Sequence, residues 1–131
     1  MGEVSVLLDS HTLLWWLDDD KRLSRRARTT IAAHRTTVFV SAASVWEIAI
    51  KVELGKLRDP TDAVRHFPML LAERGLTDLH ITAAHAVAAA ALPRIHRDPF
   101  DRMLVAQAIV EGVPIVTDNP LLPKYGIEVI W

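Results

Sequence analysis

The stretch VSVLLDSHTLLWWL (residues 4–17) sets the architecture of this chain. Val4 to Leu8 is a short apolar run rich in β-formers, which is typical of a buried strand, and Ser10 to Leu17 favours a short helix. Asp9 stands alone at the junction between them. A buried strand followed at once by a helix is the repeating unit of a parallel α/β sheet. The remainder of the chain repeats this alternation, so the sequence predicts an α/β fold built on a parallel sheet.

The alternation continues to the end of the chain, with no shift in composition that would mark a linker. We therefore expect one domain over residues 1–131. Further strands are expected at residues 38–40, 79–81, 114–117 and 128–131. Further helices are expected at residues 24–34, 42–53, 61–74, 82–93 and 98–111. Ser24, Ser41, Thr61 and Thr82 are suited to cap four of these helices, and Asp98-Pro99 is a strong start signal for the last.

Composition excludes several classes of protein. Half of the 131 residues are apolar and 24% are charged, which supports a packed core and excludes a disordered chain. The absence of cysteine excludes a disulfide scaffold, a thiolate zinc site and a cysteine nucleophile, and suits a cytoplasmic location. No apolar run is long enough to cross a membrane. A net charge of −1 provides no general attraction for nucleic acid, so such binding would require a local patch or metal ions.

Acidic residues fall at positions where a parallel sheet would bring them together. Asp9 ends the first strand and Asp118 follows the strand at 114–117. Ligand sites in such sheets form beyond the carboxyl ends of the strands, where the strand order reverses. Asp9 and Asp118 can meet there if their two strands are neighbours.

Three more acids have both a structural and a functional interpretation. Glu47 lies in an apolar helical stretch, where an ion pair with Lys51 one turn later is the structural alternative. Asp98 is an excellent helix cap, and Asp101 suits the positive end of the helix dipole. The functional interpretation rests on convergence, because several carboxylates in one place must either become protonated or recruit cations. Oxygen ligands favour Mg²⁺ or Mn²⁺, and carboxylate-bound metals suit phosphoryl chemistry.

Four segments together resemble one family. They are LLDSHT (7–12), VSAASVWEI (40–48), HRDPFDRMLVAQA (96–108) and IVTDN (115–119). In this order and at these separations, they resemble PIN-domain proteins, and within them the VapC toxins of bacterial toxin–antitoxin pairs. The resemblance covers essentially the whole chain. It implies a three-layer α/β/α sandwich with a central parallel sheet, Mg²⁺- or Mn²⁺-dependent cleavage of RNA, homodimerisation and inhibition by a cognate VapB-type antitoxin.

The resemblance also assigns the acids. Asp9, Glu47, Asp101 and Asp118 match the acidic quartet of the family, and Asp98 is an additional acid that caps the helix, touches the metal, or does both. Our hypothesis is that Asp9 and Asp101 are the principal metal ligands. Glu47 and Asp118 would complete the shell, partly through water, or orient the attacking water.

Other residues near these acids have open roles. Ser10, Thr117 and Asn119 are candidates to bind a ligand carboxylate or a phosphate, with a local turn or cap as the alternative. Arg97 and Arg102 are candidate RNA contacts, although Arg102 is also spaced to pair with Asp98. For His11 and His96 a catalytic role is less favoured than a structural one. The adjacent Trp15 and Trp16 are expected to be buried on opposite sides of their helix. Core or edge packing is expected for Trp46 and Trp131.

Three alternatives remain open at this point. The first is a PIN-like nuclease or phosphotransfer enzyme with a DNA or other substrate. The second is a phospho-receiver signalling module, although receivers carry paired acids after the first strand and Asp9 stands alone here. The third is a catalytically idle binding partner that keeps the fold.

Overall fold

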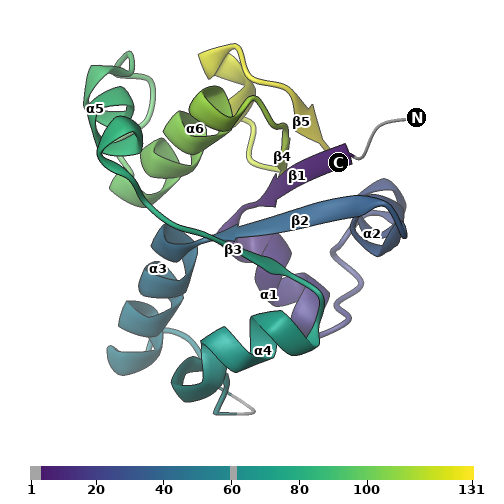
Figure 1. Cartoon of the computed structure of the whole chain (residues 1–131). Helices are drawn as coiled ribbons and strands as arrows, with labels where there is room; N and C mark the ends of the chain where they lie inside the picture. The colour runs from purple at the N-terminus through teal and green to yellow at the C-terminus, as the bar shows by residue number, and fades with distance from the viewer. Residues whose placement is uncertain (1–3, 60–61) are drawn as a thin grey trace.

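A central parallel sheet organises the molecule, described here from a computed structural model over residues 4–59 and 62–131 (Figure 1). Its strands in spatial order are β3 (Thr77–Leu79), β2 (Thr36–Ser41), β1 (Val4–Leu8), β4 (Ile115–Val116) and β5 (Val129–Ile130). The chain passes from β1 outward through β2 to β3 and then returns to the other side of β1. The strand order therefore reverses between β1 and β4, which are hydrogen-bonded neighbours with Leu8 opposite Val116.

The helices are α1 (Ser10–Leu17), α2 (Arg25–Ala32), α3 (Ala42–Glu53), α4 (Phe67–Glu73), α5 (Ala83–Ala91) and α6 (Pro99–Glu111). Two short 3₁₀ helices complete the set, η1 (Ala63–His66) and η2 (Leu122–Tyr125). Within the described residues, no helix has the length and hydropathy needed to span a lipid bilayer.

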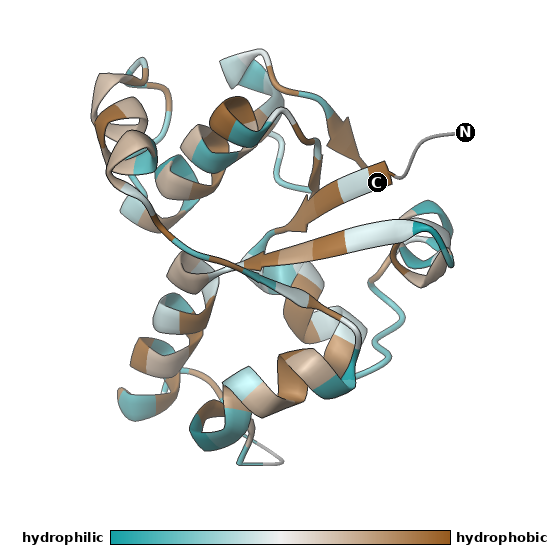
Figure 2. Cartoon of the chain, in the orientation of Figure 1, coloured by the Kyte–Doolittle hydropathy of each residue, from teal (hydrophilic) through white to brown (hydrophobic). Residues whose placement is uncertain are grey.

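Alternate residues of β1 face two separate cores, as the two-residue period of a strand requires. Val6 and Leu8 join a core with side chains of α1 to α4, and Leu7 joins a second core with side chains of α6 and η2. Helix α5 packs on the outside of α6. Figure 2 shows β2 becoming more hydrophobic toward its carboxyl end, where it enters these cores. The three-layer α/β/α sandwich with a parallel sheet is thereby confirmed.

Two predicted elements are placed differently in the structure. The helix expected over 61–74 is divided into η1 and α4, because Pro68 lacks an amide hydrogen and fits only the first turn of a new helix. The expected cap at Thr61 lies outside the described residues. The strand expected at 79–81 is β3 at Thr77–Leu79, since its partner β2 ends at Ser41 opposite Leu79. The short helix η2 was not predicted from the sequence.

The tryptophans correct two expectations. Trp15 and Trp16 are both half-buried and pack against the same core, rather than on opposite sides. Trp131 stacks near Trp15, with 5.7 Å between ring centroids, so its predicted packing role is confirmed. Trp46 is 62% exposed and belongs to neither core, so core packing is wrong for this residue, whereas its contact with Phe100 agrees with the alternative of edge packing.

Candidate active site

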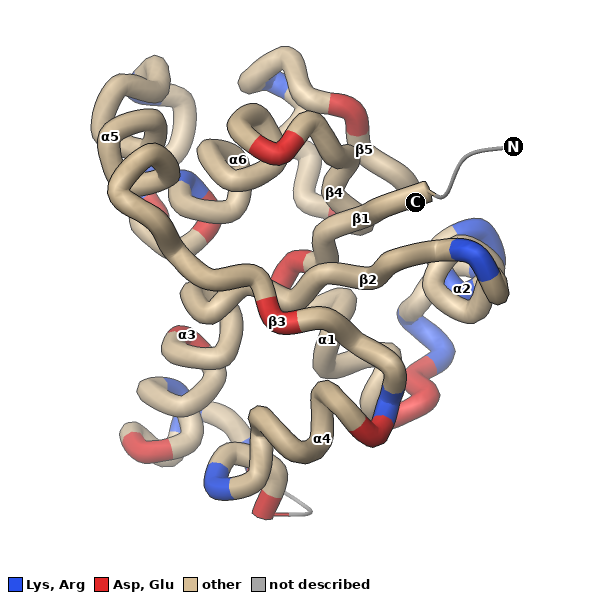
Figure 3. The backbone as a smooth tube through the Cα atoms, viewed as in Figure 1, with Lys and Arg blue, Asp and Glu red and all other residues tan. Residues whose placement is uncertain are grey.

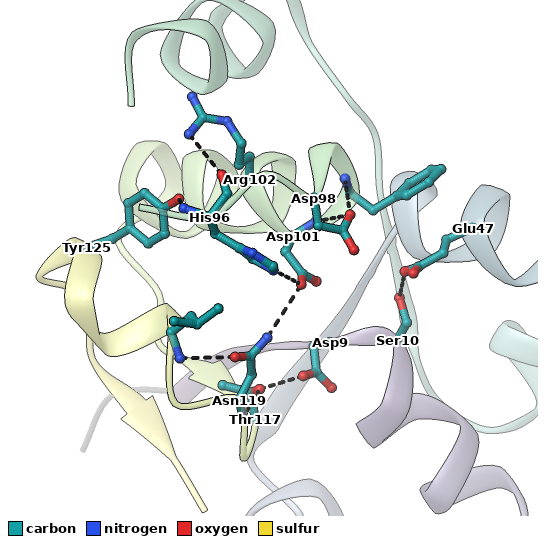
Figure 4. Close-up of polar contacts among 12 residues, drawn as sticks. Asp9, Ser10, Glu47, His96, Asp98, Asp101, Arg102, Thr117, Asn119 and Tyr125 are labelled. Atoms are coloured by element: carbon teal, nitrogen blue, oxygen red, sulfur yellow. Dashed lines mark hydrogen bonds and ion pairs between the residues drawn. The ribbon is translucent and has the colours of Figure 1, made fainter. Parts of the chain in front are cut away.

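Asp9 lies at the carboxyl end of β1 and is almost fully buried. It caps α1, because its Oδ1 accepts a hydrogen bond of 2.8 Å from the amide of Thr12. Its Oδ2 accepts a hydrogen bond from the hydroxyl of Thr117, which follows β4. The expected meeting of the ends of these two strands is thus made by Thr117, next to the predicted Asp118. These two bonds fix the carboxylate at the reversal of strand order, and Figure 4 shows the one from Thr117.

Glu47 reaches the same place from α3, with 5% of its surface exposed. Its Oε1 accepts a bond of 2.6 Å from the hydroxyl of Ser10, the residue after Asp9. Its Oε2 pairs with Nζ of Lys51 at 2.9 Å, so the ion pair considered from the sequence is present. The structural and functional interpretations of Glu47 are therefore compatible. One oxygen of its carboxylate pairs with Lys51, and the other bonds Ser10, next to Asp9.

The start of α6 supplies two more carboxylates. Oδ1 of Asp98 accepts bonds from the amides of Phe100, at 2.8 Å, and Asp101, at 3.4 Å, which confirms its role as the helix cap. Asp101 points inward one turn later, and its side chain is 18% exposed. Its Oδ2 lies 2.8 Å from Nε2 of His96 and 3.4 Å from Nδ2 of Asn119.

His96 is the residue whose part in the site the sequence understated. Its amide donates to the hydroxyl of Tyr125 at 2.9 Å, which anchors the segment before α6 on η2. One ring nitrogen and one oxygen from each of Asp98 and Asp101 lie within 4.8 Å of one another, a spacing suited to a metal ion. The motif His-x-Asp-Pro-Phe-Asp at 96–101 was the signal for this role, since it puts the imidazole just outside the helix cap.

The environment of Asp101 opposes its negative charge. Burial raises the pKa of this carboxyl above its ordinary value of 3.8, and the charges of Asp98 and Glu47 raise it further. The hydrogen bond from His96 lowers the pKa of Asp101; this influence is smaller than that of burial but larger than that of either neighbouring carboxylate. A carboxyl perturbed by burial and by like charges indicates a functional site, and here it indicates a place where added positive charge would be favourable.

A hydrogen-bonded chain joins the acids of β1 and α6. The amide of Asn119 donates to the Thr117 hydroxyl at 3.0 Å, while its side-chain amide approaches Asp101. The side-chain oxygen Oδ1 of Asn119 accepts a hydrogen bond of 3.0 Å from the amide of Leu121, so the turn interpretation of this residue also holds. Asp118 itself is exposed, and no hydrogen bond or ion pair to its carboxylate occurs among residues 4–59 and 62–131. Its place among metal ligands stays a prediction.

The two arginines near the site differ. Arg102 donates to four backbone oxygens between the end of α5 and the start of α6, namely those of Ala89, Leu92, Pro93 and His96, at 2.9–3.4 Å. It therefore holds the connection between the two helices, and the alternative pairing with Asp98 is wrong. Arg97 is exposed beside Asp98, and its contact with RNA stays a prediction.

The family of the chain follows from comparison with known proteins. Residues 6–127 match the model of the PIN domain. The chain belongs to the PIN domain family. This PIN domain is 36% identical over 122 residues to a protein of Mycobacterium tuberculosis named Ribonuclease VapC22, with 92% of each chain covered. It is also 36% identical, over 58 residues only, to Ribonuclease VapC16 of the same organism. Membership in the family sets aside the phospho-receiver alternative.

Solved structures agree with the fold of this PIN domain. VapBC2 from Rickettsia felis, bound to a fragment of promoter DNA, matches with a TM-score of 0.72 at 13% identity, covering 96% of this chain and 97% of that one. VapBC-1 from nontypeable Haemophilus influenzae matches with a TM-score of 0.69 at 13% identity, covering 96% of both chains. The α/β/α architecture is therefore shared although few residues are identical.

Proposed function

We propose that this PIN domain is a metal-dependent endoribonuclease and the toxin of a VapBC-type toxin–antitoxin pair. One observation carries the proposal: carboxylates from β1, α3 and α6 gather where the strand order reverses, and the pKa of Asp101 among them is raised. The named ribonuclease to which the chain is 36% identical supports RNA as the substrate. Such a toxin acts where cellular RNA is found, so a cytoplasmic location is part of the proposal.

The donor set suits a divalent cation of the kind the family implies. Carboxylate oxygens predominate, which favours Mg²⁺ or Mn²⁺. Asp9 and Asp101 are the proposed principal ligands, and Asp98, Glu47 and Asp118 would complete the shell directly or through water. When bound, such an ion lowers the pKa of a water molecule and offsets negative charge on the scissile phosphate.

The chain's own side chains hold these acids in place. Thr12 and Thr117 fix Asp9, Ser10 and Lys51 fix Glu47, and His96 and Asn119 fix Asp101. Because an ionised Asp101 can only accept, the proton between it and His96 belongs to Nε2 of the imidazole. His96 is therefore a positioning residue, which directs one oxygen of Asp101 and leaves the other for the site.

The substrate contacts remain part of the proposal. Arg97 is exposed next to the cap of α6, and we propose that it contacts a phosphate of the substrate. Ser10 and Thr117 donate their hydroxyl hydrogens to Glu47 and Asp9, so we assign both to orienting the acids. The side-chain amide of Asn119 approaches Asp101 with one N–H and has a second N–H, which we assign to a phosphate oxygen of the substrate. Arg102 is committed to backbone oxygens and serves the substrate only by shaping the α5–α6 connection.

An antitoxin and a second copy complete the proposed assembly. The structural relatives include VapBC complexes from two organisms, which supports a VapB-type partner for this chain. We propose a homodimer on the resemblance to VapC toxins.

Cleavage of RNA by the purified protein tests the function. We expect a labelled RNA to be cut with Mg²⁺ or Mn²⁺ and to stay intact with EDTA. Asp9→Asn should lower the rate at least about 100-fold, since replacing even an outer-shell partner of a metal commonly costs 10- to 100-fold. Asp19→Asn, the same change at an exposed loop, is the matched control and should cut normally. Cutting that persists in EDTA and in Asp9→Asn would refute the proposal, and faster cutting of DNA than of RNA would move it to the DNA alternative.

A further inference from the structure

Two aromatic side chains bridge the helices that carry the acids. Trp46 on α3 directly precedes Glu47, and Phe100 on α6 lies between Asp98 and Asp101. Their ring centroids are 5.3 Å apart with an interplanar angle of 76°, an edge-to-face contact. The aromatic pair is therefore fixed at the edge of the candidate active site.

The pair is not part of either core. Both clusters of buried apolar side chains, as defined over the described residues, omit Trp46 and Phe100, whereas Trp15, Trp16 and Trp131 all pack against the first. Trp46 keeps 62% of its surface exposed. An indole left in water beside a polar site is a surface available for a ligand with a flat apolar face.

A hollow next to Trp46 indicates which class of ligand the indole can bind. A hollow of about 220 Å³ lies between α3 and α4, with the indole in its wall together with Val45, Ala49 and Leu71. Asp78 is the single charged residue among the described residues that line it. A hollow that is apolar and holds a carboxylate repels phosphate, while it accepts a nucleobase with N–H groups on its edge.

We propose that Trp46, supported by Phe100, is the stacking platform for one nucleobase of single-stranded RNA next to the bond that is cut. The proposal rests on the proposed ribonuclease function and adds how the substrate is held. A chain with a net charge of −1 gains little from general attraction to the backbone, so stacking supplies binding that electrostatics does not. The platform sets which position along the RNA enters the site. Because every base has a flat face that can stack, it tolerates several bases at that position.

Binding of short RNA tests the platform. Fluorescently labelled single-stranded RNA is titrated into the Asp9→Asn protein with Mg²⁺, so that cleavage does not interfere. Adding Trp46→Ala should weaken binding about fivefold or more, as expected for loss of one base–aromatic stack. Trp46→Tyr keeps an aromatic face and should retain most of the affinity. Leu54→Ala, which removes another side chain that is 62% exposed beyond the other end of α3, is the matched control and should bind normally.

A series of RNAs with one abasic nucleotide at successive positions makes the test specific. Against the parent protein, one position should show a loss similar to that of Trp46→Ala. In the Trp46→Ala protein the same RNA should show no further loss, because the two changes remove one interaction. RNA binding should also quench tryptophan fluorescence, and Trp46→Phe should abolish most of that quenching. In cleavage by the otherwise wild-type enzyme, Trp46→Ala should raise KM more than it lowers kcat.

The outcomes separate this inference from the function on which it rests. Equal RNA affinity of Trp46→Ala and the parent protein, with the wild type still cutting RNA, overturns the platform and leaves the ribonuclease intact. A changed oligomeric state in Trp46→Ala with unchanged RNA affinity also overturns it, and assigns the exposed face to a second copy. A wild-type protein that neither binds nor cuts any RNA overturns the proposed function first.

Discussion

The acids before α2 and the acids of the candidate active site are the same residue types in opposite electrostatic surroundings. Before α2, Asp20 bonds Arg22 at 2.8 Å and Asp19 bonds Arg28 of α2. Asp19 and Arg22 are exposed, and their partners are partly exposed. The Arg22 guanidinium lowers the pKa of Asp20 to about 2. In the site, burial and neighbouring carboxylates raise the pKa of Asp101.

The contrast shows that the negative charges at the carboxyl ends of the strands are not balanced by cationic side chains. Figure 3 shows positive and negative segments adjoining around α2. Among the ion pairs of the described residues, only Lys51 and the imidazole of His96 approach the acids of the site. Asp19 and Asp20 each pair with an arginine, whereas the carboxylates at the carboxyl ends of the strands outnumber their cationic partners. This surplus of negative charge is the physical reason for a divalent cation there.

Among these substitutions, replacing His96 is expected to have the largest effect on the site, because the partly buried carboxylate of Asp101 loses the hydrogen bond that orients it. His96→Ala should lower cleavage or the affinity for Mn²⁺ by about 10- to 100-fold, as for other residues that orient a ligand. His96→Gln keeps an N–H donor and should lose less. Mn²⁺ titration of the cleavage rate measures this. His34→Ala, at an exposed position near α2, is the control, and an equal loss there would show that His96 has no special role.

Removing the cation paired with Glu47 is expected to destabilise the protein. Lys51→Met leaves a carboxylate whose side chain is 7% exposed without its partner and should cost about 1 kcal/mol, reduced by the partial exposure of Lys51. Urea unfolding in EDTA gives the value. Added Mg²⁺ should recover part of the loss by replacing the missing charge. Lys56→Met, an exposed lysine just beyond α3, should behave as wild type. If Mg²⁺ leaves the free energy of unfolding of Lys51→Met unchanged, the result would contradict a cation site around Glu47.

Neutralising Asp101 should stabilise the metal-free protein by a smaller amount that depends on pH. The folded-state pKa of this carboxyl is raised, so the folded protein holds a proton that the unfolded chain has already lost. Wild-type stability therefore falls as pH rises from the unfolded pKa, near 3.9, through the raised pKa, and the cost is complete above it.

Asp101→Asn does not carry this cost. In EDTA its free energy of unfolding should equal that of wild type at the acidic end and exceed it progressively toward neutral pH. Urea unfolding at a series of pH values measures the difference. A variant that is less stable at neutral pH would show that Asp101 serves the helix start more than the site.

Replacing Asp20, which pairs with Arg22 before α2, should change the stability least among these substitutions. The contribution of Asp20 to stability depends on pH in the opposite direction to that of Asp101. The depressed pKa of Asp20 contributes stability that is present above about 3.9 and is lost as pH falls toward about 2. Solvent screens this pair, so Asp20→Asn should lower Tm slightly in dilute buffer at pH 7 and have no effect near 1 M salt, where the Debye length is about 3 Å. A loss that persists at high salt would mean that Asp20 acts through its backbone contacts.

The sequence predicted much of the frame because the signals are local. Asp9 follows an apolar strand, Pro99 and Gly112 mark the two ends of α6, and the apolar run of β1 predicts its burial. Pro68 is likewise a local signal for the division of the helix expected at 61–74. By contrast, the shift of β3 depends on where its partner β2 ends, which no local pattern states.

The site was predicted as a set of residue types, and its arrangement required the fold. Glu47 meets Ser10 across 37 positions, and Thr117 takes the place beside Asp9 that the sequence suggested for Asp118. For Trp46 the sequence left core packing and edge packing open. Its exposure follows from the rotation of α3, which turns Glu47 inward and the preceding side chain toward Phe100.

The bond between Thr117 and Asp9 joins residues 108 positions apart, and this has a consequence during synthesis. While the chain is still emerging from the ribosome, Asp9 lacks the hydroxyl that fixes it, and α6 lacks the strand beside which it packs. The candidate active site, which uses both Asp9 and Thr117, is therefore complete only after the chain has been made just past the end of β4.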